Sequence, residues 1–76
     1  MYNILDTVVL SRDLPDHGLR RGDLGAVVHV YPPDGIEVEF VLASGQTQSL
    51  VSLHATDVRA VGGSDLIAVR ELRRTA

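Results

Sequence analysis

Residues 36–42, IEVEFVL, alternate apolar side chains with Glu37 and Glu39. A period of two residues is typical of a β-strand with one buried face, because successive side chains of a strand point to opposite sides. The preceding segment, residues 26–31 (AVVHVY), carries valine on both faces, which indicates a central or sharply bent strand. The turn sequence PPDG, residues 32–35, separates the two segments. This hairpin constrains the chain most, since it commits the middle of the sequence to a sheet.

Three further segments extend the β pattern. We predict a first strand within residues 6–14, a return strand over residues 47–53, and a short fifth strand over residues 58–61 after one 3₁₀ turn at residues 54–57. Residues 15–25 hold one proline and three glycines and are too polar to pack as a strand, which predicts a long irregular loop. We therefore expect an all-β fold, a small five-stranded antiparallel SH3-like barrel, because closure hides edges that 76 residues could not otherwise cover.

A change in character occurs after residue 61. Gly62 and Gly63 separate the last segment from the barrel, while Ser64 and Asp65 are residues that often begin helices. Three arginines near the C-terminus would complement the end of a helix. The sequence thus predicts a barrel over residues 1–61. Over residues 62–76, it predicts either a short C-terminal amphipathic helix or a tail that is frayed or caps the barrel's open end.

Composition narrows the class of protein. With two tyrosines, one phenylalanine and no tryptophan, the core must be aliphatic and thin, and small folds of that kind are usually supplemented by disulfides, a metal or a partner. Cysteine is absent, so disulfides and thiolate metal sites are excluded. We therefore expect a protein partner or a homo-oligomer, with no cofactor and no small-molecule substrate.

Charge and hydropathy exclude other partners. Ten acids against seven bases, all of them arginine, leave a net charge of -3, which argues against non-specific attraction to nucleic acid or anionic lipid. No apolar run approaches the roughly 20 residues that span a bilayer, and the N-terminus lacks the pattern of a signal peptide. We expect a cytoplasmic protein that makes no contact with membranes.

Residues that could carry chemistry do not form a recognisable site. His17, His29 and His54 fall in a loop, a strand and a turn, without the short spacings of metal ligands. His54 with Ser52 and Asp57 supplies the residue types of a catalytic triad, but a triad is defined by geometry and needs a pocket. We therefore expect no catalytic, metal-binding or cofactor-binding residues.

The carboxylates of Glu37 and Glu39 share one face of their strand. Such a face is usually solvated and discourages pairing between sheet edges. In a functional alternative, it would join Asp13, Asp16 and Asp34 to meet a basic protein partner through complementary charge.

The first third of the chain carries a spaced pattern of acids, leucines, glycines and valines. Its positions are Asp6, Val8, Leu10, Asp13, Leu14, Pro15, Gly18, Leu19, Gly22, Asp23, Gly25, Val27 and Val28. This pattern resembles the beginning of a family of small bacterial proteins of unknown function. The resemblance continues through EVEF and HATDVRAV, covers about residues 5 to 61, and implies an SH3-like barrel without an established activity.

A looser similarity is to the KOW motif of ribosomal and transcription proteins, whose glycine-rich corner Gly22, Asp23, Gly25, Val27 and Val30 would occupy. That similarity implies RNA binding. KOW motifs that bind RNA usually add lysine and arginine around the corner, however, and this chain offers only Arg20 and Arg21 there, beside several acids.

The basic residues available for nucleic acid are few. A single-strand binder also needs aromatic side chains on which bases stack, and Tyr31 is the one candidate. The corresponding basic patch would consist of Arg12, Arg20, Arg21 and Arg59.

We expect a non-catalytic protein–protein interaction module, such as the small partner or neutraliser of a larger protein. Residues 13–24 are the expected contact surface, because loops on a rigid scaffold can vary without loss of the core. A KOW-like RNA-binding module is the alternative, and a small enzyme is the third reading. The candidate partner-binding residues are Asp13, Asp16, His17, Arg20, Arg21 and Tyr31.

Overall fold

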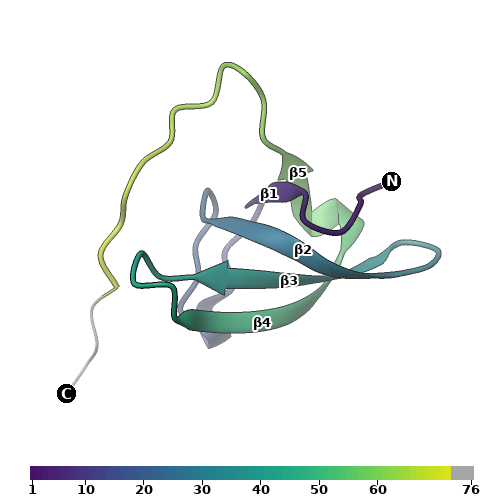
Figure 1. Cartoon of the computed structure of the whole chain (residues 1–76), viewed down its shortest axis with the longest axis horizontal. Helices are drawn as coiled ribbons and strands as arrows, with labels where there is room; N and C mark the ends of the chain where they lie inside the picture. The colour runs from purple at the N-terminus through teal and green to yellow at the C-terminus, as the bar shows by residue number, and fades with distance from the viewer. Residues whose placement is uncertain (73–76) are drawn as a thin grey trace.

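The computed structural model describes residues 1–72 and contains one antiparallel sheet (Figure 1). The strand order across the sheet is β4-β3-β2-β1-β5, so the first strand lies between the second and the last. The prediction of a five-stranded antiparallel all-β fold is confirmed. The strands are β1 (Thr7–Leu10), β2 (Leu24–Tyr31), β3 (Gly35–Val41), β4 (Thr47–His54) and β5 (Val58–Ala60).

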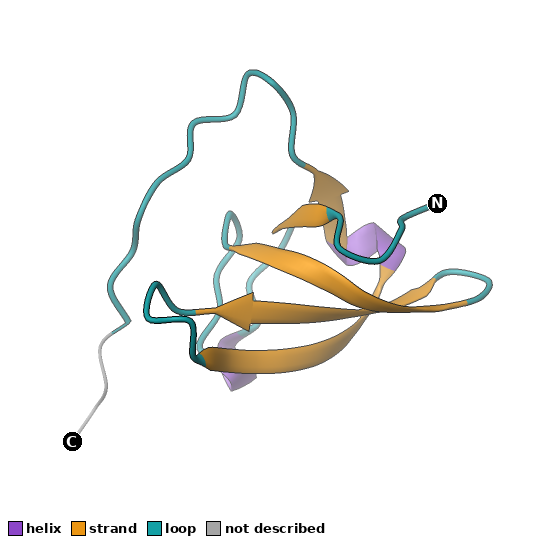
Figure 2. Ribbon diagram, in the orientation of Figure 1, coloured by secondary structure: helices purple, strands orange, loops and turns teal. Residues whose placement is uncertain are grey.

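The sheet is open. Strands β4 and β5 are its two edges, and they are not hydrogen-bonded to each other. Strand β5 has only three residues and pairs with β1, which leaves its other side without a partner strand. Two 3₁₀ turns, η1 (Pro15–His17) and η2 (Ala55–Asp57), lie outside the sheet (Figure 2). Closure into a barrel is therefore not observed.

The core is aliphatic, as its composition required. Strand β3 alternates as predicted, with Ile36, Val38 and Phe40 buried and the two glutamates only partly covered. Phe40 is the single aromatic side chain among the buried hydrophobic residues. The core cluster consists of Val8, Leu10, Leu14, Leu19, Val27, Ile36, Val38, Phe40, Val51, Leu53 and Val58.

Strand β2 is central and bent, as its valines on both faces indicated. It pairs with β3 and with β1, and its register with β3 shifts between Val27 and His29. The shift inserts Val28 as an extra residue, which lets Val27 and Val30 both point toward the core side. An extra residue of this kind bends a strand and increases its twist.

The 3₁₀ turn η2 joins β4 to β5, as predicted for residues 54–57. The Asp57 carboxylate accepts hydrogen bonds from the His54 amide, at 2.9 Å, and from Arg12 Nε, at 2.8 Å. The bond from Arg12 is the main cause that lowers the pKa of Asp57. The Asp57 backbone carbonyl also accepts a hydrogen bond from the Ser11 amide, so η2 fixes the position of the chain just after β1.

Several boundaries differ from the sequence prediction. Strand β2 begins at Leu24, inside the loop predicted over residues 15–25, because Leu24 pairs with Val9 of β1. The first strand ends at Leu10, because the chain then turns away and its next amide bonds to Asp57 outside the sheet. Of the two alternatives for the C-terminal segment, the short helix is absent from residues 62–72. A helix so brief is marginal unless it packs on something. Arg73 and Arg74, expected at the end of that helix, lie outside the residues that the structure describes.

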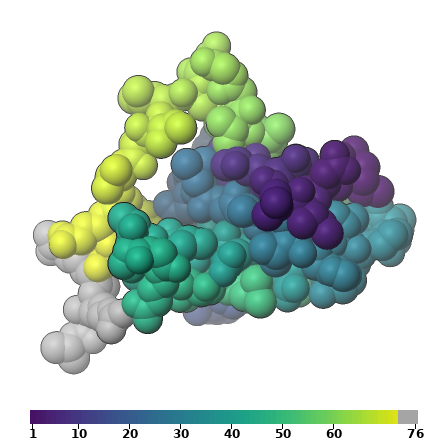
Figure 3. Space-filling model, viewed as in Figure 1, coloured from purple at the N-terminus to yellow at the C-terminus, as the bar shows by residue number. Residues whose placement is uncertain are grey.

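Residues 62–72 instead form a drawn-out segment that we call the strap. It leaves the end of β5, arches away from the sheet and comes back beside the β3–β4 turn (Figures 1 and 3). Its residues Leu66, Ile67 and Val69 are 91%, 71% and 99% exposed. No helix within residues 1–72 is long and apolar enough to cross a membrane.

Gly25 is the position at which the sheet tolerates no side chain. A Cβ there would lie 2.5 Å from Val38 Cγ1 and 2.9 Å from Phe40 Cε1, inside the core. We predict that Gly25→Ala lowers the free energy of unfolding by about 1–3 kcal/mol through overpacking, measured by urea denaturation. Gly63→Ala is the matched control, because nothing lies within 4 Å of its added Cβ. Equal stability of the two variants would contradict the close approach.

Candidate functional site

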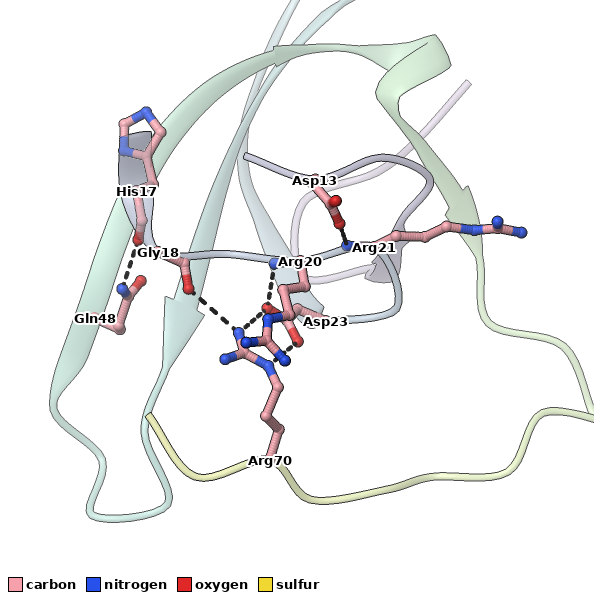
Figure 4. A network of polar contacts seen from close by, with 8 residues as sticks. All are labelled: Asp13, His17, Gly18, Arg20, Arg21, Asp23, Gln48 and Arg70. Carbon is pink, nitrogen blue, oxygen red and sulfur yellow. Dashed lines mark hydrogen bonds and ion pairs between the residues drawn. The ribbon is translucent and has the colours of Figure 1, made fainter. Parts of the chain in front are cut away.

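The β1–β2 loop, residues 11–23, is tied to itself and to the core although it lacks strands. Leu14 and Leu19 form an isolated antiparallel bridge, with amide–carbonyl bonds of 2.9 and 3.1 Å, and both side chains are buried in the core. The Asp13 carboxylate accepts from the Arg21 amide at 2.8 Å, and the Asp23 carboxylate accepts from the Arg20 amide at 2.8 Å (Figure 4). Core burial and two aspartates therefore give this loop one shape.

The loop presents charged side chains to solvent. Asp16, His17, Arg20 and Arg21 are all exposed, and their side chains make no hydrogen bond or ion pair with any residue from 1 to 72. The His17 carbonyl accepts from Gln48 Nε2 at 2.8 Å, so strand β4 holds the backbone of η1 in place. Side chains of both signs are thus displayed on a fixed backbone.

The strap returns to this loop through Arg70. Its guanidinium donates to both Asp23 carboxylate oxygens, from Nε at 3.2 Å and from Nη2 at 2.5 Å, and Nη2 also approaches the Gly18 carbonyl at 3.3 Å (Figure 4). Partial burial raises the pKa of Asp23, but the hydrogen bonds from Arg70 and the Arg20 amide outweigh it and lower the pKa overall. Arg70 and Asp23 are mostly shielded, with side chains 29% and 19% exposed.

A second ion pair holds the start of the strap. Arg59 Nη1 and Nη2 donate to the two Asp65 oxygens at 2.8 and 2.9 Å, and the Gly62 amide donates to Asp65 Oδ2 at 2.6 Å. These bonds, led by that of Arg59, lower the pKa of Asp65 to about 2. The strap is therefore fastened at Asp65 and at Arg70, with four residues between them.

A cleft of about 680 Å³ lies between the strap and the sheet. We call it the strap cleft. Five of the residues that line it have large hydrophobic side chains that are exposed. Leu66, Ile67 and Val69 belong to the strap, and Leu24 and Val41 belong to the sheet. Val9 also lines it and is buried on the outer face of β1, away from the core cluster. The cleft is therefore an apolar surface that the strap bridges but does not cover.

The six predicted partner-binding residues fall into two places. Asp13, Asp16, His17, Arg20 and Arg21 lie together on the β1–β2 loop, where Asp13 also fixes the backbone. Tyr31 lies at the far end of β2, one strand length from the loop, or up to roughly 23 Å at 3.3 Å per residue. Its ring packs against His29, with centroids 4.3 Å apart.

The predicted basic patch is partly engaged. Arg12 pairs with Asp57 and Arg59 pairs with Asp65, each at 2.8 Å, which leaves Arg20 and Arg21 as its unpaired members among residues 1–72. The histidines stay apart: His54 Nε2 lies 2.8 Å from Asp34 Oδ2, and His29 packs on Tyr31. In the part of the chain that is described, no three histidine or carboxylate side chains gather as metal ligands.

The sequence did not indicate the residues that build the strap cleft. Arg70 was assigned to the end of a helix, and its partner Asp23 lies 47 positions earlier. The available signal was Asp23 in the family pattern, which marks a structural acid but does not identify its partner. Asp65 was expected to start a helix, and it instead binds the Gly62 amide and the Arg59 guanidinium.

Comparison with protein families identifies a match. A family model described as "Domain of unknown function (DUF4926)" matches residues 4–60, well over half of the 76 residues. This confirms the resemblance seen over about residues 5 to 61, and the matched region ends where the strap begins. No curated protein and no solved structure matches the chain.

Asp13 and Asp16 form a matched pair for testing the loop. We predict that Asp13→Ala lowers the free energy of unfolding by about 1 kcal/mol, because the Arg21 amide loses its acceptor. Asp16→Ala should change it by less than about 0.5 kcal/mol, since its side chain is exposed and unbonded. Urea denaturation of both variants checks this, and a larger effect at Asp16 would contradict the loop geometry.

The Asp23–Arg70 pair allows us to predict how the Asp23 carboxyl group titrates. The lowered pKa of Asp23 means that the pair stabilises the folded chain above the ordinary carboxyl pKa, and that this contribution is lost as pH falls through the lowered value. We predict that Arg70→Ala raises the pKa of Asp23 and leaves that of Asp57, which Arg12 lowers, unchanged. Carboxyl-carbon NMR titration measures both, and an unmoved Asp23 would show that the strap is not fastened in solution.

Proposed function

The chain belongs to the DUF4926 family of domains of unknown function, and from the surface that this domain presents we propose that it is a non-catalytic protein–protein interaction module. Its partner would be a larger protein, for which this chain serves as the small partner or neutraliser. A cytoplasmic location, expected from the sequence, belongs to the same proposal.

One observation carries the proposal: the β1–β2 loop has a fixed backbone and unbonded charged side chains. The Leu14–Leu19 bridge and the Asp13 and Asp23 carboxylates hold the backbone, while the side chains of Asp16, Arg20 and Arg21 are exposed and make no hydrogen bond with residues 1–72. The Arg20 side chain bends toward Asp23 and Arg70 (Figure 4). A surface that is ordered before binding loses less conformational entropy when a partner arrives. Charges of both signs would then select the partner by electrostatic complementarity.

An SH3-like barrel is the finer description of the fold that we favour. The order β4-β3-β2-β1-β5 with a 3₁₀ turn between β4 and β5 supports it. In that description, the β1–β2 loop corresponds to the long loop after the first strand of an SH3-like barrel. The open side of the sheet is then the place where a closed barrel would be completed.

RNA binding is the alternative. Arg20 and Arg21 are the observations in its favour, because their side chains are exposed. Arg12 and Arg59, however, are held by aspartates, and Tyr31 lies at the opposite end of β2. A basic groove with interleaved aromatic side chains is therefore not assembled around the loop.

An enzyme ranks third. A catalytic histidine would need to face a concave site beside a carboxylate. His54 does contact Asp34, but no histidine lines the strap cleft or the smaller cavity next to it.

Affinity purification from native cells at low salt tests the proposal. We predict a stoichiometric protein companion in the eluate, identified by intact-complex mass spectrometry, and a ratio of absorbance at 260 and 280 nm typical of protein. Arg20→Gln combined with Arg21→Gln should reduce recovery of the companion about tenfold or more, because both charges leave the contact surface. The variant should unfold at the same urea concentration as the wild type.

Asn3→Asp is a control that also makes the net charge more negative, at an exposed position near the N-terminus. It should retain the companion. A nucleic-acid absorbance that disappears at high salt would favour the RNA alternative. Unchanged recovery with the double arginine variant would remove the β1–β2 loop as the contact surface.

A further inference from the structure

The Asp23 carboxylate and the Gly18 carbonyl form an acceptor site for one guanidinium. Three oxygens converge on Arg70, at 2.5, 3.2 and 3.3 Å. Bidentate bonding of a carboxylate by arginine is directional and stronger than a bond between neutral groups. The site therefore recognises the fork of an arginine side chain and not merely positive charge.

This acceptor site is held in shape by contacts that do not involve Arg70. The Arg20 amide donates to Asp23 Oδ2, the Asp23 amide donates to the Arg20 carbonyl, and the Asp23 carbonyl accepts from Leu10 at 2.9 Å. Gly18 follows η1, whose backbone Gln48 holds. The site is thus preorganised by the loop, and Arg70 occupies it as one ligand would.

The strap is a loosely held occupant. Between its two ion pairs, Leu66, Ile67 and Val69 are 91%, 71% and 99% exposed, so they contribute little burial. The backbone of residues 66–72 forms no hydrogen bonds with other backbone within residues 1–72. The two glycines that precede the strap, Gly62 and Gly63, are exposed, and a Cβ at Gly63 would meet nothing. The strap can therefore swing away once its arginine is released.

Two cavities adjoin the Arg70 guanidinium, and residues of the strap form part of the wall of each. The strap cleft, about 680 Å³, has an apolar floor that includes Leu24 and Phe40. A second cavity of about 510 Å³ shares Leu19, Arg70 and Leu72 with it and is lined beyond them by residues of the β1–β2 loop and by Glu71. We call these two cavities, with the arginine site that both adjoin, the arginine groove.

We propose that the arginine groove binds an extended segment of a partner protein that carries an arginine flanked by aliphatic residues, and that the strap is the stand-in that such a segment displaces. This deepens the proposed function and rests on it, since the partner is the one that the interaction module would engage. The charge of the occupant follows from the Asp23 carboxylate, whose two oxygens face the guanidinium position. Asp13 and Arg20 of the loop both line the second cavity, so Asp23 is the acid that the occupant must neutralise. A basic residue on the partner complements this acid.

The tether makes the strap an effective competitor. A segment joined by a short flexible linker has an effective concentration in the millimolar range at its own site. A free segment of similar sequence must compete with it and will bind the intact chain weakly. Removing the strap's arginine should therefore uncover the groove and increase the affinity for a segment added in trans.

The test uses the full chain and two synthetic peptides. The probe is a fluorescently labelled, acetylated and amidated peptide of residues 64–72, SDLIAVREL, and the control is the same peptide with Arg70→Gln. Fluorescence anisotropy should show that the probe binds the Arg70→Ala chain about tenfold more tightly than the wild type. Adding Asp23→Asn to that chain, or using the control peptide, should abolish the gain.

Other outcomes overturn the proposal. Equal binding of both peptides, or binding that survives Asp23→Asn, would mean that the groove does not select an arginine. If the Arg70→Ala chain proves unfolded by circular dichroism, Asp65→Asn is the second variant, because it loosens the strap at its other end and should also increase probe binding. A wild-type dimer in ultracentrifugation that Asp23→Asn converts to monomers would assign the groove to a second copy instead of a partner.

The two proposals can fail separately. A native companion that is lost with the Arg20 and Arg21 substitutions but retained with Asp23→Asn would overturn the arginine groove and leave the interaction module in place. Probe binding as expected, with no companion recovered from cells, would count against the interaction module and not against the chemistry of the groove.

Discussion

The burial of Leu14 and Leu19 is the interaction on which the arrangement of the surface depends. These side chains are 6% and 5% exposed and come from a segment with no strand of its own. Because they enter the core from a loop, the polar residues around them are forced into a narrow turn, and the loop takes one shape. Asp23, Arg20 and Arg21 are placed by this turn, and the strap is placed in turn by Asp23.

Two glycines connect this loop to the sheet for different reasons. Gly22 has a φ of 95°, a conformation that side chains other than glycine rarely adopt, and its amide donates to the Leu10 carbonyl at 2.9 Å. Glycine is required at position 25 because a side chain there would collide with Val38 and Phe40. The Gly-Asp-x-Gly corner of the family pattern therefore has a complete structural explanation, in which Asp23 also turns its carboxylate toward the strap.

Three arginine–aspartate pairs tie distant parts of the chain together. Arg12–Asp57 joins the β1–β2 loop to η2, Arg59–Asp65 joins β5 to the strap, and Arg70–Asp23 joins the strap to the loop. Pairs near the surface contribute little to stability, because solvent screens them and long side chains lose entropy. Their main effect is to fix where the segments that they join lie relative to one another. A strap held in this way can be fastened without being permanently attached, which suits a segment that a partner would replace.

The strands, their order along the chain and the aliphatic core could be predicted from the sequence, because each depends on local periodicity and on glycine and proline at turns. The β1–β2 loop could be predicted as irregular and as the place where charged residues gather. Its two buried leucines, the open sheet and the extended strap could not. Arg70 meets Asp23 across 47 positions, and Tyr31 is separated from the loop by the length of β2. Such pairings depend on how a curved sheet brings segments together in space, and no pattern of neighbouring residues encodes that distance.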